Sequence, residues 1–171
     1  WEDGDYVIRI RGKVAESAVF GENMVLTREF MVKMGEACVH VRDRVENCGH
    51  TQAPLMLLYH CNFGYPLVSE DTVLIEPEGT KVRARDAEGE KDIDRYMKFE
   101  APAHGYNEQV FYHDIPKVKG DESYACLYNK KLGLGGYVKF NRAQFTNFGE
   151  WKMMGEGDYV VGLEPSNSLP E

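Results

Sequence analysis

The chain has 171 residues, of which 43% are hydrophobic and 28% are charged, and its formal net charge is −8 at pH 7. These values are typical of a globular domain with a buried core. No apolar run reaches the roughly 18 residues that a membrane-spanning helix needs. An acidic chain without a basic stripe is also a poor partner for nucleic acids and anionic membranes. We therefore expect neither a nucleic-acid partner nor a membrane partner.

Alternation of apolar and polar residues predicts β-strands along most of the chain. In chain order, these strands cover residues 5–14, 24–34, 38–47, 72–75, 108–112, 123–128, 135–140 and 158–163. Segments rich in glycine, proline and asparagine separate them, and no stretch has a sustained helical period. The pattern predicts an all-β fold, an antiparallel β-sandwich that forms a single domain over residues 1–171.

Two segments depart from this alternation. Residues 55–59 (LMLLY) are continuously apolar, which predicts a central strand covered on both faces. His60 follows directly, so we expect it at the rim of the core. The charged stretch 83–94 has few apolar residues and is interpreted as a solvated loop or hairpin arm without a functional role.

The cysteines and histidines give little indication of a metal site. Four cysteines are present, without a CxxC pair or zinc-like spacing, at Cys38, Cys48, Cys61 and Cys126. We interpret them as free buried thiols, which are typical of a reducing compartment, and therefore expect a cytoplasmic location. The histidines also lack ligand spacing, so we expect no metal ion.

His60 is the first candidate for chemistry. A histidine beside an apolar strand is more often structural than catalytic, but its neighbours add to the case. Asn62 offers a hydrogen-bond donor and acceptor, Phe63 and Tyr65 offer flat apolar faces, and Gly64 allows close approach to the backbone. Sugars require this combination, because their hydroxyls need directional partners while their C–H faces pack against aromatic rings.

Glu164 is the second candidate, at the end of a strong predicted strand and just before Pro165. Alone it would be interpreted as a surface charge. Together with His60 it forms an acid and base pair with intrinsic pKa values of about 4.3 and about 6.5. A third candidate stretch, GYNEQVFYHD, places Tyr106 and Glu108 at the entry to a strand. There, a polar strand edge and a hydroxyl-binding role are equally consistent with the pattern.

The segments HCNFGYPL and YVVGLEPSN resemble the aldose 1-epimerase (galactose mutarotase-like) superfamily, specifically its bacterial aldose 1-epimerase-like branch. Mutarotases carry a histidine in a motif of the form N-H-x-Y-F-N. The corresponding segment here, residues 59–64, shares that histidine, His60, and the phenylalanine three residues later, Phe63. The superfamily also has a catalytic glutamate at the end of a C-terminal strand, which corresponds to Glu164.

The resemblance implies an incomplete β-sandwich of the supersandwich type, and interconversion of the α and β anomers of an aldose by ring opening. His60 would be the acid and Glu164 the base, facing one concave sheet with room for a pyranose ring between them. No cofactor would be needed. The residues expected to bind the sugar are Asn62, Phe63, Tyr65, Tyr106 and Glu108.

An arginine and a second histidine of the superfamily have no counterpart here, because Arg28 and His40 stand in a different context. We therefore expect the chain to be a C-terminal portion of a longer protein with an incomplete site, which leaves catalysis by the chain alone open. A sheet edge left without its neighbouring strand also predicts that the chain can form a homo-oligomer.

Two other classes of function remain open. One is a carbohydrate-binding domain without turnover, in which Tyr65, Tyr106 and Trp151 stack against a sugar. The other is a structural β-domain whose active partner segment lies outside this chain. Calorimetric binding of a sugar without faster anomer exchange favours the first. A melting temperature that no monosaccharide shifts favours the second.

Overall fold

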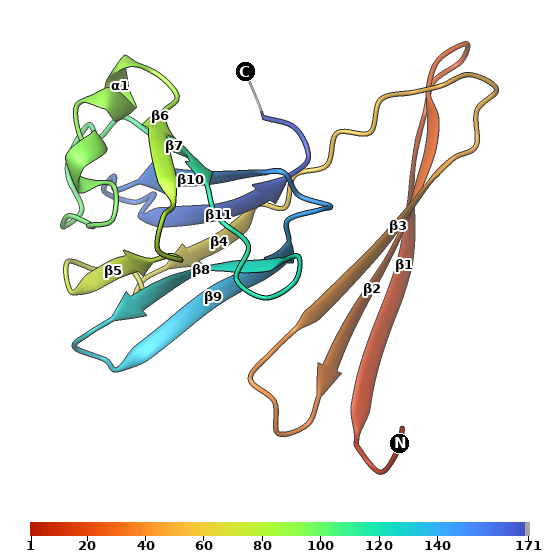
Figure 1. The fold of residues 1–171 in the computed structure, drawn as a ribbon, viewed down its shortest axis with the longest axis horizontal. Coiled ribbons are helices and arrows are strands. Elements are labelled where there is room, and N and C mark those ends of the chain that lie inside the picture. The colour runs from red at the N-terminus through yellow and green to blue at the C-terminus, as the bar shows by residue number, and fades with distance from the viewer. Residues whose placement is uncertain (170–171) are drawn as a thin grey trace. The chain divides into compact units, whose positions relative to one another are not determined.

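A computed structural model describes residues 1–169 and divides the chain into two compact units, Trp1–Leu55 and Met56–Glu171 (Figure 1). Both consist mainly of antiparallel strands, which confirms the predicted all-β class. The single domain expected over residues 1–171 stays a prediction. No helix among the described residues is long and apolar enough to cross a membrane.

The N-terminal unit is a three-stranded meander in the order β1 (Val7–Ser17), β2 (Asn23–Lys33) and β3 (His40–Asn47). The register aligns Ile10 with Phe30 and Phe30 with Val41, so apolar side chains gather on one face. Within that face the Nε and Nη2 groups of Arg28 donate hydrogen bonds to the carboxylate of Asp43, at distances from 2.6 to 3.2 Å. The alternating apolar residues of the sequence thus share one face of a small sheet, as period two requires.

The C-terminal unit contains two sheets (Figure 1). The five-stranded sheet has the order β4 (Cys61–Gly64), β11 (Val160–Ser166), β10 (Asn147–Met153), β7 (Gln109–Asp114) and β6 (Lys81–Ala84). The three-stranded sheet has the order β5 (Thr72–Ile75), β8 (Glu122–Asn129) and β9 (Leu134–Asn141). A short helix, α1 (Ala87–Glu90), and a 3-10 turn, η1 (Ile93–Arg95), follow β6.

The core of this unit lies between the two sheets. Phe140 on β9 and Phe148 on β10 stack across the interface, with ring centroids 5.3 Å apart. Val161 and Leu163 of β11 are fully buried in the same cluster. Because side chains alternate along a strand, Gly162 lies on the opposite face of the sheet. That face carries the candidate site.

Charged side chains are also buried on the core side of the sheet. His113 lies between two carboxylates, with Nδ1 2.7 Å from Glu76 Oε1 and Nε2 3.4 Å from Glu150 Oε2. Burial lowers the pKa of His113, but the two carboxylates outweigh it and raise the pKa to about 9. Lys152 is fully buried and donates a 2.7 Å hydrogen bond to the backbone oxygen of Lys98. The sheet therefore contains a buried ionic layer beneath its open face.

The central strand predicted over residues 55–59 is wrong. Leu55 and Met56 are 47% and 72% exposed, and the segment pairs with β11 through a single bridge between Leu58 and Ser166. His60 instead precedes β4, which is an edge strand of the sheet. The run was misinterpreted because a continuous apolar segment does not by itself reveal which of its side chains are covered.

The predicted burial of the thiols is also wrong. Cys48 is exposed, and Cys38, Cys61 and Cys126 are half-buried. All four are free. The cytoplasmic location that rested on this interpretation stays a prediction.

Candidate active site

The candidate site lies on the face of the five-stranded sheet that is turned away from the core. In the register of the sheet, Gly162 of β11 pairs with Asn62 of β4 on one side and with Trp151 of β10 on the other. Two residues along β11, Glu164 pairs with Gly149. Paired residues, and residues two apart on one strand, share a face. Asn62, Trp151 and Glu164 therefore belong to one surface.

His60 and Glu164 are in direct contact on this surface. His60 Nε2 lies 2.9 Å from Glu164 Oε1, and the side chain of His60 is 45% exposed while that of Glu164 is only 7% exposed. His60 Nδ1 lies 2.7 Å from Asn62 Oδ1, so the amide oxygen accepts the proton on that nitrogen and fixes the ring. The imidazole thus has one nitrogen held by an amide and the other beside a carboxylate.

This contact corrects the expected spacing of the pair. Both groups face one sheet, as the sequence predicts, but a separation of 2.9 Å leaves no room for a pyranose ring between them. A sugar that used both groups would have to lie over the pair. The site thus offers an adjacent acid and base in place of two groups on opposite sides of a ring.

Two glycines make space for the carboxylate of Glu164. A β-carbon on residue 162 would lie 2.6 Å from Glu164 Oε1 and 2.9 Å from His60 Cε1. A β-carbon on residue 149 would lie 3.4 Å from Glu164 Oε2. Gly162 and Gly149 flank Glu164 on its own strand and on the next one, and together they form the floor on which the carboxylate rests. The requirement for glycine here is one of close approach.

The electrostatic surroundings raise the pKa of Glu164. Burial is the largest cause, and the neighbouring carboxylate of Glu108 acts in the same direction. The charges of His60 and Arg85 act in the opposite direction without outweighing burial. Glu164 therefore takes up a proton at a higher pH than an ordinary glutamate, which is the tuning expected of a general base or acid.

Trp151 stands beside this pair and is held in place by a chain of polar contacts. Its ring centroid lies 5.3 Å from that of His60 in an edge-to-face arrangement. Its indole N–H donates to Glu108 Oε2 at 2.8 Å, and Arg85 Nη2 donates to Glu108 Oε1 at 2.9 Å. These two donors lower the pKa of Glu108, so that its carboxylate stays ionised. The site thus has a positioned aromatic side chain next to its acid and base pair.

The predicted sugar-binding residues divide into two groups. The structure brings Asn62 and Glu108 together with His60 and Glu164. Phe63 packs against the core, because it follows Asn62 by one residue and alternation turns it to the other face. Tyr106 also packs against the core and donates its hydroxyl to Gln109. Tyr65 is 80% exposed and follows β4 at the end opposite His60.

Two residues of the site were not foreseen in these roles. Trp151 was considered only as a stacking residue, and its bond to Glu108 had no signal in the sequence, since 43 positions separate the two. Arg85 lies in the charged stretch that was interpreted as a solvated loop. Only the hydrogen bond to Glu108 identifies Arg85 as part of the site, and Glu108 becomes its neighbour only when β6 pairs with β7.

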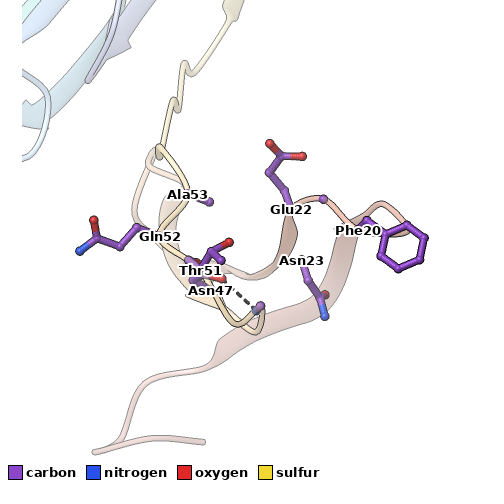
Figure 2. Close-up of a pocket in the computed structure, with 9 residues that line it drawn as sticks. Phe20, Glu22, Asn23, Asn47, Thr51, Gln52 and Ala53 are labelled. Atoms are coloured by element: carbon purple, nitrogen blue, oxygen red, sulfur yellow. Dashed lines mark hydrogen bonds between the residues drawn. The ribbon is translucent and has the colours of Figure 1, made fainter.

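A separate hollow of about 180 Å³ lies in the N-terminal unit, between the turn after β1 and the segment after β3 (Figure 2). Amide, hydroxyl and small side chains line most of it, with the carboxylate of Glu22 at one side. Asn47 is engaged locally, accepting from the N–H of Gly49 and donating to the carbonyl of Thr51. We interpret this hollow as a product of the local turns.

Across residues 1–169, no three His, Cys, Asp or Glu side chains converge on a possible metal site.

Comparison with known proteins gives a family and a fold. A family model described as "Domain of unknown function (DUF4432)" matches residues 1–171. No curated protein matches the sequence. Among solved structures, the chain is similar to a protein from Klebsiella pneumoniae subsp. pneumoniae named a "putative aldose 1-epimerase", with a TM-score of 0.91 and 23% identity. At this level of identity, the likeness shows the fold alone.

The match covers 98% of this chain and 44% of the Klebsiella protein, so the chain spans less than half of that protein's length. These comparisons do not support the prediction that the chain is a C-terminal portion of a longer protein.

Proposed function

The chain belongs to the DUF4432 family, and we propose that it binds an aldose over the open face of its five-stranded sheet and interconverts the α and β anomers. The observation that carries this proposal is the contact between His60 and Glu164, 2.9 Å apart beside a positioned tryptophan. The fold shared with the Klebsiella protein is consistent with a carbohydrate isomerase. Membership of the bacterial aldose 1-epimerase-like branch is part of the same proposal.

The reaction needs one proton delivered to the ring oxygen and one removed from the anomeric hydroxyl. Both oxygens are bonded to the anomeric carbon, so two single bonds separate them, a span comparable to the His60–Glu164 contact. A protonated His60 donates from Nε2 to the ring oxygen while the ionised Glu164 accepts the hydroxyl proton. The bond between the anomeric carbon and the ring oxygen breaks, and an open-chain aldehyde forms.

Rotation about the bond between the first two carbons then presents the other face of the aldehyde. His60 takes back the proton from the former ring oxygen as that oxygen attacks the carbonyl carbon, and Glu164 returns its proton to the carbonyl oxygen. Both residues end in their starting states, so the step balances in protons and electrons. Each positioned group typically contributes about 10²–10⁴-fold to such a reaction.

The surrounding side chains supply what sugar binding requires. Trp151 offers a flat apolar surface held by Glu108, and the partly exposed oxygens of Glu108 accept hydrogen bonds from hydroxyls. Asn62 is exposed beside His60 and has an amide NH₂ directed by the same contact that engages its oxygen. These residues define the proposed sugar-binding set, in which Phe63, Tyr65 and Tyr106 have no direct part.

The test is the rate of anomer exchange of glucose and galactose, measured by exchange NMR with this chain as catalyst. The variants are His60→Ala and Glu164→Gln. The chain offers a matched control, the exposed pair His104 and Glu156, whose Nδ1 and Oε2 lie 3.5 Å apart in the same unit. We expect exchange to fall about 10²-fold or more in either site variant and to be unchanged in His104→Ala. Equal rates in wild type and both site variants would overturn the proposal.

A second candidate function is sugar binding without turnover. The feature that favours it is the same contact, because Glu164 Oε1 already faces His60 Nε2 at 2.9 Å in the absence of a sugar. In that case Trp151, Asn62 and Glu108 bind the ring and the ion pair only orders the surface. Calorimetry that detects a bound aldose, in a sample that shows no faster anomer exchange, would establish this alternative.

A further inference from the structure

A second hollow, of about 260 Å³, lies beside the candidate site on the C-terminal unit. Strands β6, β7 and β10 contribute to its lining, which includes Lys81, Arg83, Tyr112 and Asn147. The register relates it to the site: Arg83 pairs with Tyr112, Tyr112 with Gly149, and Gly149 with Glu164. Paired residues share a face, so this row runs from the hollow directly to the proposed base.

Within the described part of the chain, no carboxylate pairs with the two cations of the hollow, Lys81 and Arg83. Lys81 and Arg83 are exposed, lie two residues apart on β6, and therefore project from the same face. Among residues 1–169 neither forms an ion pair, whereas Asp114, which also lines the hollow, is paired with Arg142 at 3.0 Å. The described side chains that line the hollow thus carry net positive charge, in a chain whose formal net charge is −8.

Arg83 is also pre-positioned. Its guanidinium lies over the ring of Tyr112, 4.6 Å from the centroid, in a cation–π contact. The guanidinium of Arg83, a residue of β6, therefore lies over a residue of β7, one strand closer to Glu164. The remaining two strand spacings amount to roughly 10 Å, a span that a hexose with an exocyclic acidic group covers. Between them lies Gly149, which has no side chain to block the path.

We propose that Lys81 and Arg83 form a subsite for an anionic group on the sugar, a phosphate or a carboxylate, and so select acidic aldoses over neutral ones. Arg83 binds two oxygens of the group through its planar fork and Lys81 adds a point charge. The inference rests on the proposed function, since it assigns a substrate class to that site.

The test compares matched sugars by calorimetry at one ionic strength: glucose, glucose 6-phosphate and glucuronate, and their galactose counterparts. We expect at least one acidic sugar to bind roughly tenfold or more tighter than its neutral parent. The preferred acid identifies the source of the charge as phosphate or carboxylate. The double variant Lys81→Gln, Arg83→Gln should remove the preference. The control Lys119→Gln, Lys130→Gln changes the net charge equally at two exposed lysines and should retain it.

The outcomes separate this inference from the proposed function. Neutral sugars that bind and exchange anomers, with no advantage for the acidic forms, would overturn the subsite and leave the function intact. Inorganic phosphate is the probe for the subsite alone. If phosphate binds and the Lys81, Arg83 double variant abolishes that binding while no sugar exchanges anomers, the subsite stands and the function fails. Absence of binding by every acidic sugar and by phosphate would overturn the subsite.

Discussion

The carboxylate of Glu164 occupies the space directly over Gly162, where a β-carbon would lie 2.6 Å from Oε1 and 2.9 Å from His60 Cε1. The pairing of acid and base thus depends on the absence of a side chain at residue 162. A methyl group there must displace the carboxylate, the imidazole or both. Both are side-chain groups that can move without shifting the backbone, so the damage should be local.

We therefore expect Gly162→Ala to reduce anomer exchange more than tenfold while the melting temperature changes little. Gly64→Ala, on the neighbouring strand β4, is the matched control, because its β-carbon would meet the backbone oxygen of Tyr159 at an ordinary 3.5 Å. Exchange NMR and thermal melting measure the two effects. Wild-type exchange in Gly162→Ala would show that the His60–Glu164 contact is not needed.

Trp151 should contribute most of the apolar contact with the sugar. We expect Trp151→Ala to weaken aldose binding roughly tenfold, since covering about 50 Å² of apolar ring surface contributes about 1.3 kcal/mol. Tyr137→Ala removes a 56% exposed aromatic ring from β9, in the other sheet, and should leave the affinity unchanged. Calorimetric titration distinguishes the two. An equal loss in both variants would refute a specific stacking role for Trp151.

The raised pKa of Glu164 predicts the acidic limb of the pH profile. The base must be ionised, so anomer exchange should fall as the pH drops through the pKa of Glu164, above the ordinary value of 4.5. Replacing His60 by alanine removes the charge that lowers this pKa, and the carboxyl should then titrate at still higher pH. NMR titration of the Glu164 carboxyl carbon in both proteins checks the direction. A midpoint at or below 4.5 in wild type contradicts the assignment.

The buried His113 predicts how stability depends on pH. Its pKa of about 9 in the folded chain exceeds the unfolded value of 6.5, so its stabilising contribution is complete below pH 6.5 and is lost as the pH rises through 9. The two values correspond to a loss on the order of 3 kcal/mol of unfolding free energy. Urea unfolding at a series of pH values measures this slope.

His104→Gln, at a 97% exposed histidine, should leave that slope unchanged. His113→Gln should flatten it if the variant folds. The imidazole signal of His113 in wild type gives an independent check by NMR. A midpoint near or below 6.5 would mean that Glu76 and Glu150 do not hold the proton there.

The sequence predicted the strands whose alternation is regular, including β7 and β11, but it missed β4, β6 and β10. Strand β10 was not predicted because its core face combines the apolar Phe148 with the charged Glu150 and Lys152. Neither face of the strand is therefore uniformly apolar in the sequence. The charged side chains on its core side can be buried because they pair with residues distant in the sequence, as Glu150 does with His113. Single-residue patterns do not carry that information, because burial of a charge depends on its partner.

The pair His60 and Glu164 was predicted from local context and family resemblance, and the structure brings the two into contact. Their separation was not predictable, because it depends on the glycine at residue 162 and on the register of β11 against β4. Phe63 was included for its flat aromatic face and because it matches the phenylalanine of the mutarotase motif, yet it follows Asn62 directly in strand β4. Adjacent residues of a strand point to opposite faces of the sheet. Only every second residue of a contiguous motif can therefore face the same site.

The most direct measurement is a double-mutant cycle on anomer exchange with His60→Ala, Glu164→Gln and the combined variant. Two groups that act as one acid and base unit give strongly non-additive losses, so the account predicts that the double variant is about as slow as either single one. The exposed pair His104→Ala and Glu156→Gln, run in parallel, should leave exchange unchanged. Wild-type rates in the single variants, or losses that simply multiply in the double variant, would contradict the account.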